Sequence, residues 1–236
     1  MLEPSDSADC LEFTKKAFEI SEKFDVPVYL RLSTRVAHSQ SLVELSPREN
    51  AGLKEYAKNP QKYVMAPANA KVRRVAVEKR ENALREYAET CELNRIEWND
   101  KKIGIITSGV AYEYAREALG DRASYLKLGL VYPMPEKLIR SFAREVEKVY
   151  VVEELDDYIE SFCRRCGVDV RGKELFSFIG EYTPNMIRKV ILGTAPEIPA
   201  QADVPVRPPV LCPGCPHRAM FYVFGKMKLN VSGDIG

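Results

Sequence analysis

The sequence predicts an α/β fold with a parallel sheet, and two observations support that prediction. From Lys102 onward, short apolar runs typical of strands alternate with amphipathic stretches typical of helices. The strand runs are apolar throughout, which is the pattern of a parallel sheet covered by helices on both faces. A length of 236 residues and a hydrophobic content of 45% suffice for one large domain or two smaller ones.

The first 69 residues predict only two regular elements. A helix capped by Ser5 or Ser7 should run to about Lys23, and the β-rich run at 26–32 should form a strand. Residues 33–69 are rich in turn-forming residues and predict a linker or extended arm. One helix and one strand cannot bury their apolar faces alone. We therefore expect this segment to pack on the next domain, or to end a domain that begins earlier.

Residues 70–90 predict a long, heavily charged helix. Val72, Val75, Leu84 and Tyr87 keep a helical period, which indicates one buried face and one solvated face. The simpler interpretation of the charge is a helix that faces solvent, and the alternative is a binding patch.

The alternating region predicts three strands and four helices, with residues 168–170 as a further candidate strand. Gly120 should end the first of these helices, and Pro135 lies near the start of the second. The strands are expected at 103–107, 125–130 and 149–153, and the helices at 111–119, 136–146, 155–166 and 184–192.

A proline-rich linker at 195–209 should close this domain, and a new unit begins at Val210. That unit should contain a helix to about Met227 and a strand at 229–232. The chain stops directly after this strand, where an α/β domain would place a phosphate-binding turn. We expect both ends to be cut from a larger protein.

Composition argues against several classes of protein. The 35 basic and 34 acidic residues nearly cancel, so no nucleic-acid footprint and no basic face for a membrane surface is indicated. No apolar run approaches the length of a membrane span, and the N-terminus lacks the features of a signal peptide. The six cysteines are too sparse for a secreted disulfide framework, so a reducing cytoplasm is the expected location.

The most informative motif is a C-x-x-C turn formed by Cys212 and Cys215, with His217 two residues further on. Two thiols on a stiff proline-containing turn suit a soft metal or a redox pair. Spacing alone leaves chance as a strong alternative, because Cys163 and Cys166 form a second C-x-x-C. That second pair lies on the apolar side of an expected helix and predicts buried thiols.

Two further groups follow expected strands. Arg35 and His38 come after the first strand, near the sheet edge where α/β proteins place their sites, although an ordinary contact between domains is the alternative. Glu153 and Glu154 follow another strand. Paired carboxylates can serve as acid–base groups, but we favour a capped strand end here.

Three segments together resemble the indolepyruvate:ferredoxin oxidoreductase α-subunit family, a branch of the thiamine-diphosphate 2-oxoacid:ferredoxin oxidoreductases. They are the run PVYLRLSTRVAHS at 27–39, the α/β unit at 104–154, and residues 212–218 followed by 232–236. The resemblance implies a transketolase C-terminal-like domain flanked by partial pyrimidine-binding and diphosphate-binding domains. The implied boundaries are 1–45 for the pyrimidine-domain tail, 46–99 for a linker and long helix, 100–194 for the transketolase C-terminal-like domain, 195–209 for the proline-rich linker and 210–236 for the truncated diphosphate domain.

The resemblance also implies an activity. It is the oxidative decarboxylation of an aryl 2-oxoacid such as indolepyruvate to an acyl-CoA, with coenzyme A as co-substrate and ferredoxin as electron acceptor. The implied cofactors are thiamine diphosphate, Mg²⁺ and a [4Fe–4S] cluster, and a second, smaller subunit is an implied partner. Because the family places other essential residues outside the region matched here, we expect this chain alone to be inactive.

Site residues follow from the same resemblance. Cys212 and Cys215 match the first two cluster ligands, with a bare structural turn, zinc or a redox disulfide as alternatives. His217 would face thiazolium or substrate, or else only pack. Asp234 is awkward beside a diphosphate, because a carboxylate repels phosphate unless Mg²⁺ or a hydrogen bond intervenes. The implied sets are His217, Arg35 and His38 as catalytic residues, Gly214, Gly233, Asp234 and Gly236 as cofactor-binding residues, and Cys212 and Cys215 as metal ligands.

The rival hypothesis is a non-catalytic α/β subunit-interaction domain with a small zinc or redox C-x-x-C site. A zinc site needs two more ligands. Only His38 and His217 are present as histidines, and no second C-x-x-C lies in a suitable turn. This scarcity of ligands weighs against the rival.

Overall fold

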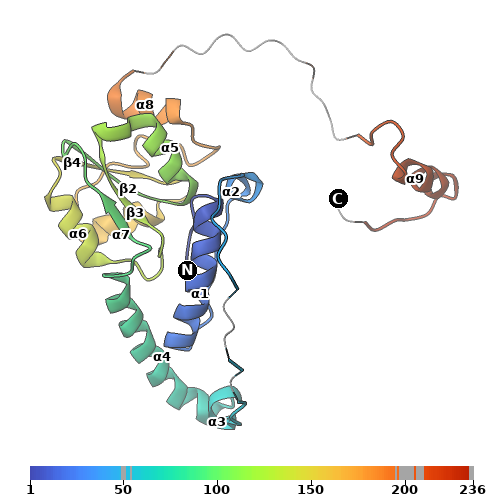
Figure 1. The fold of residues 1–236 in the computed structure, drawn as a ribbon, viewed down its shortest axis with the longest axis horizontal. Coiled ribbons are helices and arrows are strands. Elements are labelled where there is room, and N and C mark those ends of the chain that lie inside the picture. The colour runs from blue at the N-terminus through green and yellow to red at the C-terminus, as the bar shows by residue number, and fades with distance from the viewer. Residues whose placement is uncertain (49–51, 54, 195, 197–204, 206–209, 234–236) are drawn as a thin grey trace. The chain divides into compact units, whose positions relative to one another are not determined.

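The computed structural model describes residues 1–48, 52–53, 55–194, 196, 205 and 210–233. The chain divides into two compact units, Met1–Pro196 and Glu197–Gly236 (Figure 1). Within the described residues, none of the helices combines the length and the apolar character that crossing a bilayer requires.

A four-stranded sheet forms the centre of the first unit. Its strands are β1 (Arg95–Glu97), β2 (Ile103–Ser108), β3 (Ser124–Leu128) and β4 (Lys148–Val152), in the order β1-β3-β2-β4. β2 pairs in parallel with both β3 and β4, as the apolar runs predict. β1 was not predicted, and it pairs antiparallel with the outer edge of β3.

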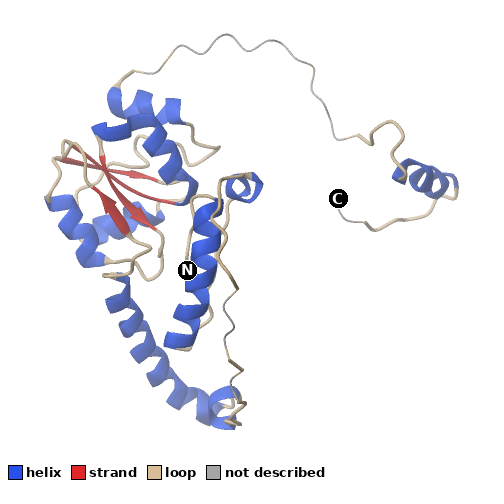
Figure 2. Cartoon of the chain, in the orientation of Figure 1, coloured by secondary structure: helices blue, strands red, loops and turns tan. Residues whose placement is uncertain are grey.

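Helices cover both faces of this sheet (Figure 2). Ile105 belongs to the apolar cluster on the face of α5 and α8, and its neighbour Ile106 belongs to the cluster on the face of α6 and α7. Successive side chains of a strand point to opposite faces, so a run of apolar residues in β2 serves both layers. The helices are α5 (Gly109–Leu119), followed by a 3-10 turn η1 (Gly120–Arg122), and α6 (Glu136–Arg144), α7 (Tyr158–Arg165) and α8 (Pro184–Leu192).

The strand order contains a reversal that matters for the site. From β2 the chain passes through α5 to β3 on one side, and from β3 it passes through α6 to β4 on the other side of β2. The helices that follow β2 and β4, which are α5 and α7, lie on opposite faces of the sheet and leave a crevice outside the carboxyl ends of these two strands. Open α/β sheets bind ligands at such switch points.

The N-terminal segment is attached to this domain by backbone pairing as well as by packing. Leu2 is fully buried and bridges Leu30 in parallel and Leu130 antiparallel. The predicted strand at 26–32 is wrong, because its only ladder contact in the structure is that bridge at Leu30. Helix α1 (Ser7–Phe24) forms as expected, although its cap is Asp6, whose side chain accepts a hydrogen bond from the backbone of Asp9.

Helices α3 (Pro60–Tyr63) and α4 (Pro67–Ala88) lie in and beyond the segment expected to be irregular. The C-terminal end of α4 joins an apolar cluster with α1, in which Leu84 and Ala88 lie with Phe13 and Ile20. Helix α1 thus packs on a later part of the same chain, which is one of the two outcomes expected from the sequence. A short helix α2 (Thr34–His38) follows Ser33, whose side chain caps it.

The second unit contains α9 (His217–Lys226), close to the predicted helix. No residue of α9 is buried. The predicted strand at 229–232 does not form, since these residues are loop in the structure. In the first unit, the candidate strand at 168–170 is likewise wrong, and only the adjacent Arg171 bridges Tyr150.

Candidate functional site

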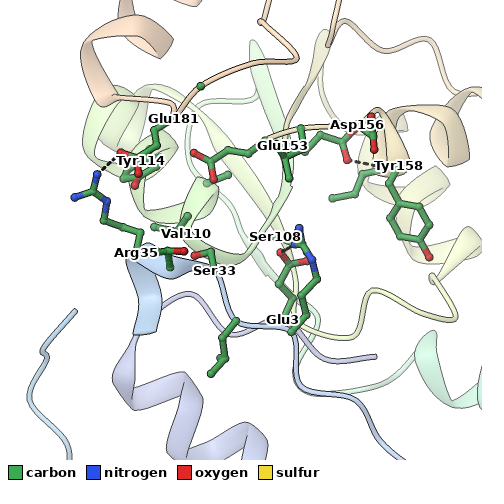
Figure 3. A pocket seen from close by; sticks show the side chains of 18 of the residues that line it. Glu3, Ser33, Arg35, Ser108, Val110, Tyr114, Glu153, Asp156, Tyr158 and Glu181 are labelled. Carbon is green, nitrogen blue, oxygen red and sulfur yellow. Dashed lines mark hydrogen bonds and ion pairs between the residues drawn. The ribbon is translucent and has the colours of Figure 1, made fainter. Parts of the chain in front are cut away.

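A cavity of about 630 Å³ lies at the switch point of the sheet (Figure 3). Ser108 lies at the carboxyl end of β2 and Glu153 directly follows β4, and both line this cavity. The N-terminal segment contributes Glu3 and the stretch 31–35 to its wall. Residues from three distant parts of the sequence therefore meet at the place where the topology predicts a site.

The side chain of Glu3 lies against the N-terminal end of α5. Its carboxylate accepts a hydrogen bond from Ser108 Oγ at 3.1 Å and is paired with the guanidinium of Arg31. Gly109 has φ of +53°, and a Cβ placed there would lie 2.9 Å from Glu3 Oε1. A carboxylate at a helix N-terminus compensates the helix dipole. The chain's own Glu3 thus fills the position at which other α/β folds place a ligand's phosphate.

Arg35 is the one predicted catalytic residue that lines this cavity. It lies on α2 and forms an ion pair with Glu181 from the loop before α8 (Figure 3). His38 ends the same helix, is exposed and does not line the cavity. The two residues were expected at the end of a strand, and the structure places them on a short helix instead.

Glu153 is buried and acts as a cap for α7. Its two carboxylate oxygens accept hydrogen bonds from the backbone N–H groups of Ile159 at 2.7 Å and Glu160 at 2.9 Å. Burial raises the pKa of Glu153 to about 7, although these two backbone bonds and Lys173 oppose the rise. The neighbouring Glu154 accepts from the backbone of Tyr182 at 2.9 Å. Both carboxylates are therefore held by backbone N–H groups, as the capping interpretation of the sequence predicts.

Sequence reasoning missed a buried ion pair between β3 and α1. Lys127 lies in β3 and is only 2% exposed. Its Nζ donates to Asp9 Oδ2 at 2.6 Å and to Ser5 Oγ at 2.8 Å, so it connects the sheet to the start of α1. Burial works to raise the pKa of Asp9, but the hydrogen bonds from Lys127 and Ser5 outweigh it and hold that pKa below its ordinary value. The sequence signal that could have revealed this ion pair is a lysine inside the apolar run of a strand.

The C-x-x-C turn of the second unit presents its thiols openly. The backbone N–H of Cys215 donates to the carbonyl of Cys212 at 3.0 Å, and Gly214 between them has φ of +79°. Cys212 is exposed, Cys215 is half-buried, and Cys215 Sγ lies 3.5 Å from His217 Nδ1. Thiolates on such a turn fit an iron–sulfur cluster or another soft metal.

The turn carries only some of the ligands that a metal site needs. Among the described residues, no group of three or more His, Cys, Asp or Glu side chains could hold a metal ion. The turn can therefore supply two of the four ligands that a [4Fe–4S] cluster requires. Cys163 and Cys166 are both buried in the first unit, as predicted, and burial raises the pKa of Cys163 to about 12.

Only part of the predicted diphosphate turn can be placed. Gly233 is exposed, and no atom lies within 4 Å of a Cβ built on it. Gly214 is similarly open. Asp234 and Gly236 lie outside the described residues. The described part of the turn leaves space for a ligand beside the backbone, and it adds no side chain that would bind one.

Comparisons with known proteins place the chain in context. No protein-family model matches it. A solved 2-oxoglutarate:ferredoxin oxidoreductase from Magnetococcus marinus, with 2-oxoglutarate, coenzyme A and succinyl-CoA bound, is similar in fold. Its TM-score is 0.58 at 17% identity, over 81% of this chain and 41% of that chain. This likeness supports the assignment of a transketolase-like α/β domain with a mostly parallel sheet.

Curated relatives are closer in sequence. The chain is 38% identical to the indolepyruvate oxidoreductase subunit IorA of Methanothermobacter thermautotrophicus over 99% of its own length and 41% of that protein. The IorA subunits of Archaeoglobus fulgidus and Thermococcus kodakarensis are 36% and 35% identical, over 96% and 100% of this chain. The chain thus spans about two fifths of the curated relatives it matches. On this similarity along nearly its whole length, the chain belongs to the family of the indolepyruvate oxidoreductase IorA subunits.

Proposed function

We propose that this chain is part of an oxidoreductase that converts aryl 2-oxoacids, indolepyruvate above all, to acyl-CoA. The reaction consumes one 2-oxoacid and one coenzyme A, releases CO₂ and a proton, and reduces two ferredoxin molecules by one electron each. The observation that carries this proposal is the 38% identity to an indolepyruvate oxidoreductase subunit over 99% of the chain.

The proposed cofactors are thiamine diphosphate with Mg²⁺ and a [4Fe–4S] cluster. When bound, thiamine diphosphate supplies carbanion stabilisation for the decarboxylation and the cluster supplies one-electron transfer. Cys212 and Cys215 would provide two cluster ligands. Gly214 and Gly233, with Asp234 and Gly236, would line the diphosphate, because glycines let a backbone approach phosphate closely.

The remaining site residues would orient the substrate and exchange protons with it. His217 begins α9 and would exchange a proton with the substrate at Nε2, while its Nδ1 faces Cys215 Sγ. Arg35 would hold a carboxylate, and His38 would act beside it at the junction with the preceding domain.

The proposed domain assignment follows the family. Residues 1–45 would end a pyrimidine-binding domain, 46–99 would connect it, and 100–194 would form the transketolase C-terminal-like domain. A linker at 195–209 would lead to the diphosphate-binding domain that starts at 210. We also propose a second, smaller subunit and ferredoxin as partners, no activity for this chain on its own, and a reducing cytoplasmic location, which the six free cysteines support.

The test is an anaerobic assay of the full-length protein co-purified with its second subunit. We expect ferredoxin reduction that requires both indolepyruvate and coenzyme A, with a kcat/KM for indolepyruvate well above those for pyruvate and 2-oxoglutarate. Pyruvate or 2-oxoglutarate as the better substrate would contradict the proposed substrate class. A protein that contains zinc in place of iron and reduces no ferredoxin would support the subunit-interaction alternative.

A further inference from the structure

The stretch around the C-x-x-C turn carries positive charge and no negative charge. Residues 210–233 include Arg218, Lys226 and Lys228, and they contain no Asp or Glu. No carboxylate within this stretch therefore neutralises its cations. Thiolates that ligate iron are anionic, so the charge of the stretch is opposite in sign to the group that its two thiols would hold.

The side chain of His217 contacts one of these thiols directly. From the first position of α9, its Nδ1 lies 3.5 Å from Cys215 Sγ. A thiolate bound to iron has no proton to donate, so in the cluster-bound protein the hydrogen bond at this contact comes from Nδ1–H. The lone pair of the neutral ring is then on Nε2, the atom to which the proposed function assigns proton exchange.

The side chain of Arg218 ties the C-x-x-C turn to the first turn of α9. Its Nη1 donates to the carbonyl of Leu211 at 3.3 Å and lies 3.5 Å from the carbonyl of Cys212. Its backbone N–H donates to the carbonyl of Cys215 at 3.1 Å. These contacts hold the guanidinium charge at the start of the turn, beside the residue that carries the first thiol.

We propose that His217 and Arg218 are positioning residues that raise the reduction potential of the cluster held by Cys212 and Cys215. The inference rests on the proposed function for the presence of that cluster, and for the electron, which comes from the oxidation of the 2-oxoacid and leaves to ferredoxin. Reduction adds one negative charge to a group that its thiolates already make anionic. A hydrogen bond to sulfur and a nearby guanidinium therefore stabilise the reduced form more than the oxidised form.

The experiment measures reduction potentials by EPR at one fixed pH, with dithionite as reductant, in the full-length protein with its second subunit. The signal that disappears in Cys212→Ala identifies the cluster. His217→Phe keeps a ring but has no N–H, and Arg218→Gln removes the charge. We expect each of these two variants to lower the midpoint potential of that signal. His217→Asn should keep the wild-type potential, because its side-chain amide can donate from the place of Nδ1–H.

Lys226→Gln is the matched control for the loss of charge. Lys226 lies at the opposite end of α9, about 13 Å further along the helix axis, so its removal should leave the potential unchanged. Iron analysis and circular dichroism of each variant verify that cluster and fold are intact. An unchanged potential in both His217→Phe and Arg218→Gln would overturn the inference, and so would an equal fall in Lys226→Gln.

Two further outcomes separate this inference from the proposed function. Survival of every EPR signal in Cys212→Ala would refute the ligand assignment, and the inference would fall with it. His217→Asn has no counterpart of Nε2, so it should lose kcat while it keeps the potential. If it kept both, the proton exchange proposed for His217 would be refuted, while the retained potential would still support the hydrogen bond to Cys215.

Discussion

At the scale of single residues, Glu153 shows burial and hydrogen bonding acting on one carboxyl group in opposite directions. Burial raises its pKa from an ordinary value of 4.5 to about 7. Between pH 4.5 and 7, the folded protein therefore keeps a proton on Glu153 that the unfolded chain has already released. The stabilisation that this proton provides is complete below pH 4.5 and is lost as the pH rises through 7.

A Glu153→Gln variant tests this directly. The wild type should lose free energy of unfolding between pH 4.5 and 7, by an amount on the order of 3 kcal/mol from this group. The variant cannot ionise at this position, so its free energy of unfolding should fall less over the same range. Urea unfolding at several pH values measures the difference. Parallel pH profiles for the two proteins would show that Glu153 titrates normally.

Lys127 and Asp9 form the contact that holds α1 to the sheet, and we expect each to be costly to remove alone. Asp9→Asn leaves the buried ammonium without its anion, and Lys127→Met leaves the carboxylate without its cation. Each should lower the free energy of unfolding by about 3–5 kcal/mol. The double variant should lose clearly less than the two single losses combined, because no charge is left unpaired. Additive losses in urea unfolding would refute a direct interaction.

The sequence located single residues best where their neighbours are local. Arg35 was predicted at the end of a strand beside a site; it lines the cavity from a short helix instead, its partner Glu181 is 146 residues away, and its site role stays a prediction. Glu3 was missed, because it meets Ser108 across 105 residues and nothing local marks that contact. Cys163 and Cys166 were predicted to be buried from a helical pattern, and they are.

At the scale of elements, the turn between β2 and α5 depends on a glycine. Gly109 has φ of +53°, and a Cβ would come within 2.9 Å of the Glu3 carboxylate. We expect Gly109→Ala to cost about 2–3 kcal/mol of unfolding free energy, partly from backbone strain and partly from displacing Glu3. Gly193→Ala is the matched control, because that residue also has positive φ but open space around it. Equal losses of Tm in the two variants would show that the contact with Glu3 contributes nothing.

Elements with complete local signals were predicted well, and those that depend on distant partners were not. The helix at 184–192 has a threonine cap, a proline in its first turn and a glycine at its end, and the structure gives it the same bounds. The run at 26–32 is rich in β-forming residues, but its available partner is the short stretch around Leu2, so only Leu30 pairs. β1 has only three residues, too few to give a periodic signal, so only its pairing with β3 defines it.

At the scale of the whole molecule, the two units differ in how much apolar surface they bury. The first unit contains three apolar clusters around its sheet. In the second, α9 has no buried residue, and Met220, Phe221 and Tyr222 are all more than half exposed. An exposed apolar face of this kind marks a surface that other protein covers. The C-x-x-C turn precedes α9 directly, so protein that covered this face would also lie close to the two thiols.

Thiol reactivity tests whether Cys212 and Cys215 hold a cluster in the complete enzyme. In metal-free protein, Cys212 should react with iodoacetamide far faster than Cys163, because Cys212 is exposed and burial raises the pKa of Cys163 to about 12. In enzyme purified without oxygen, ligation should protect Cys212 and Cys215 until the iron is removed. Cys212→Ala should lower the iron content by about four atoms per subunit, whereas Cys163→Ala should leave it unchanged. Peptide mass spectrometry and iron analysis measure both effects, and full iron content in Cys212→Ala would exclude the ligand assignment.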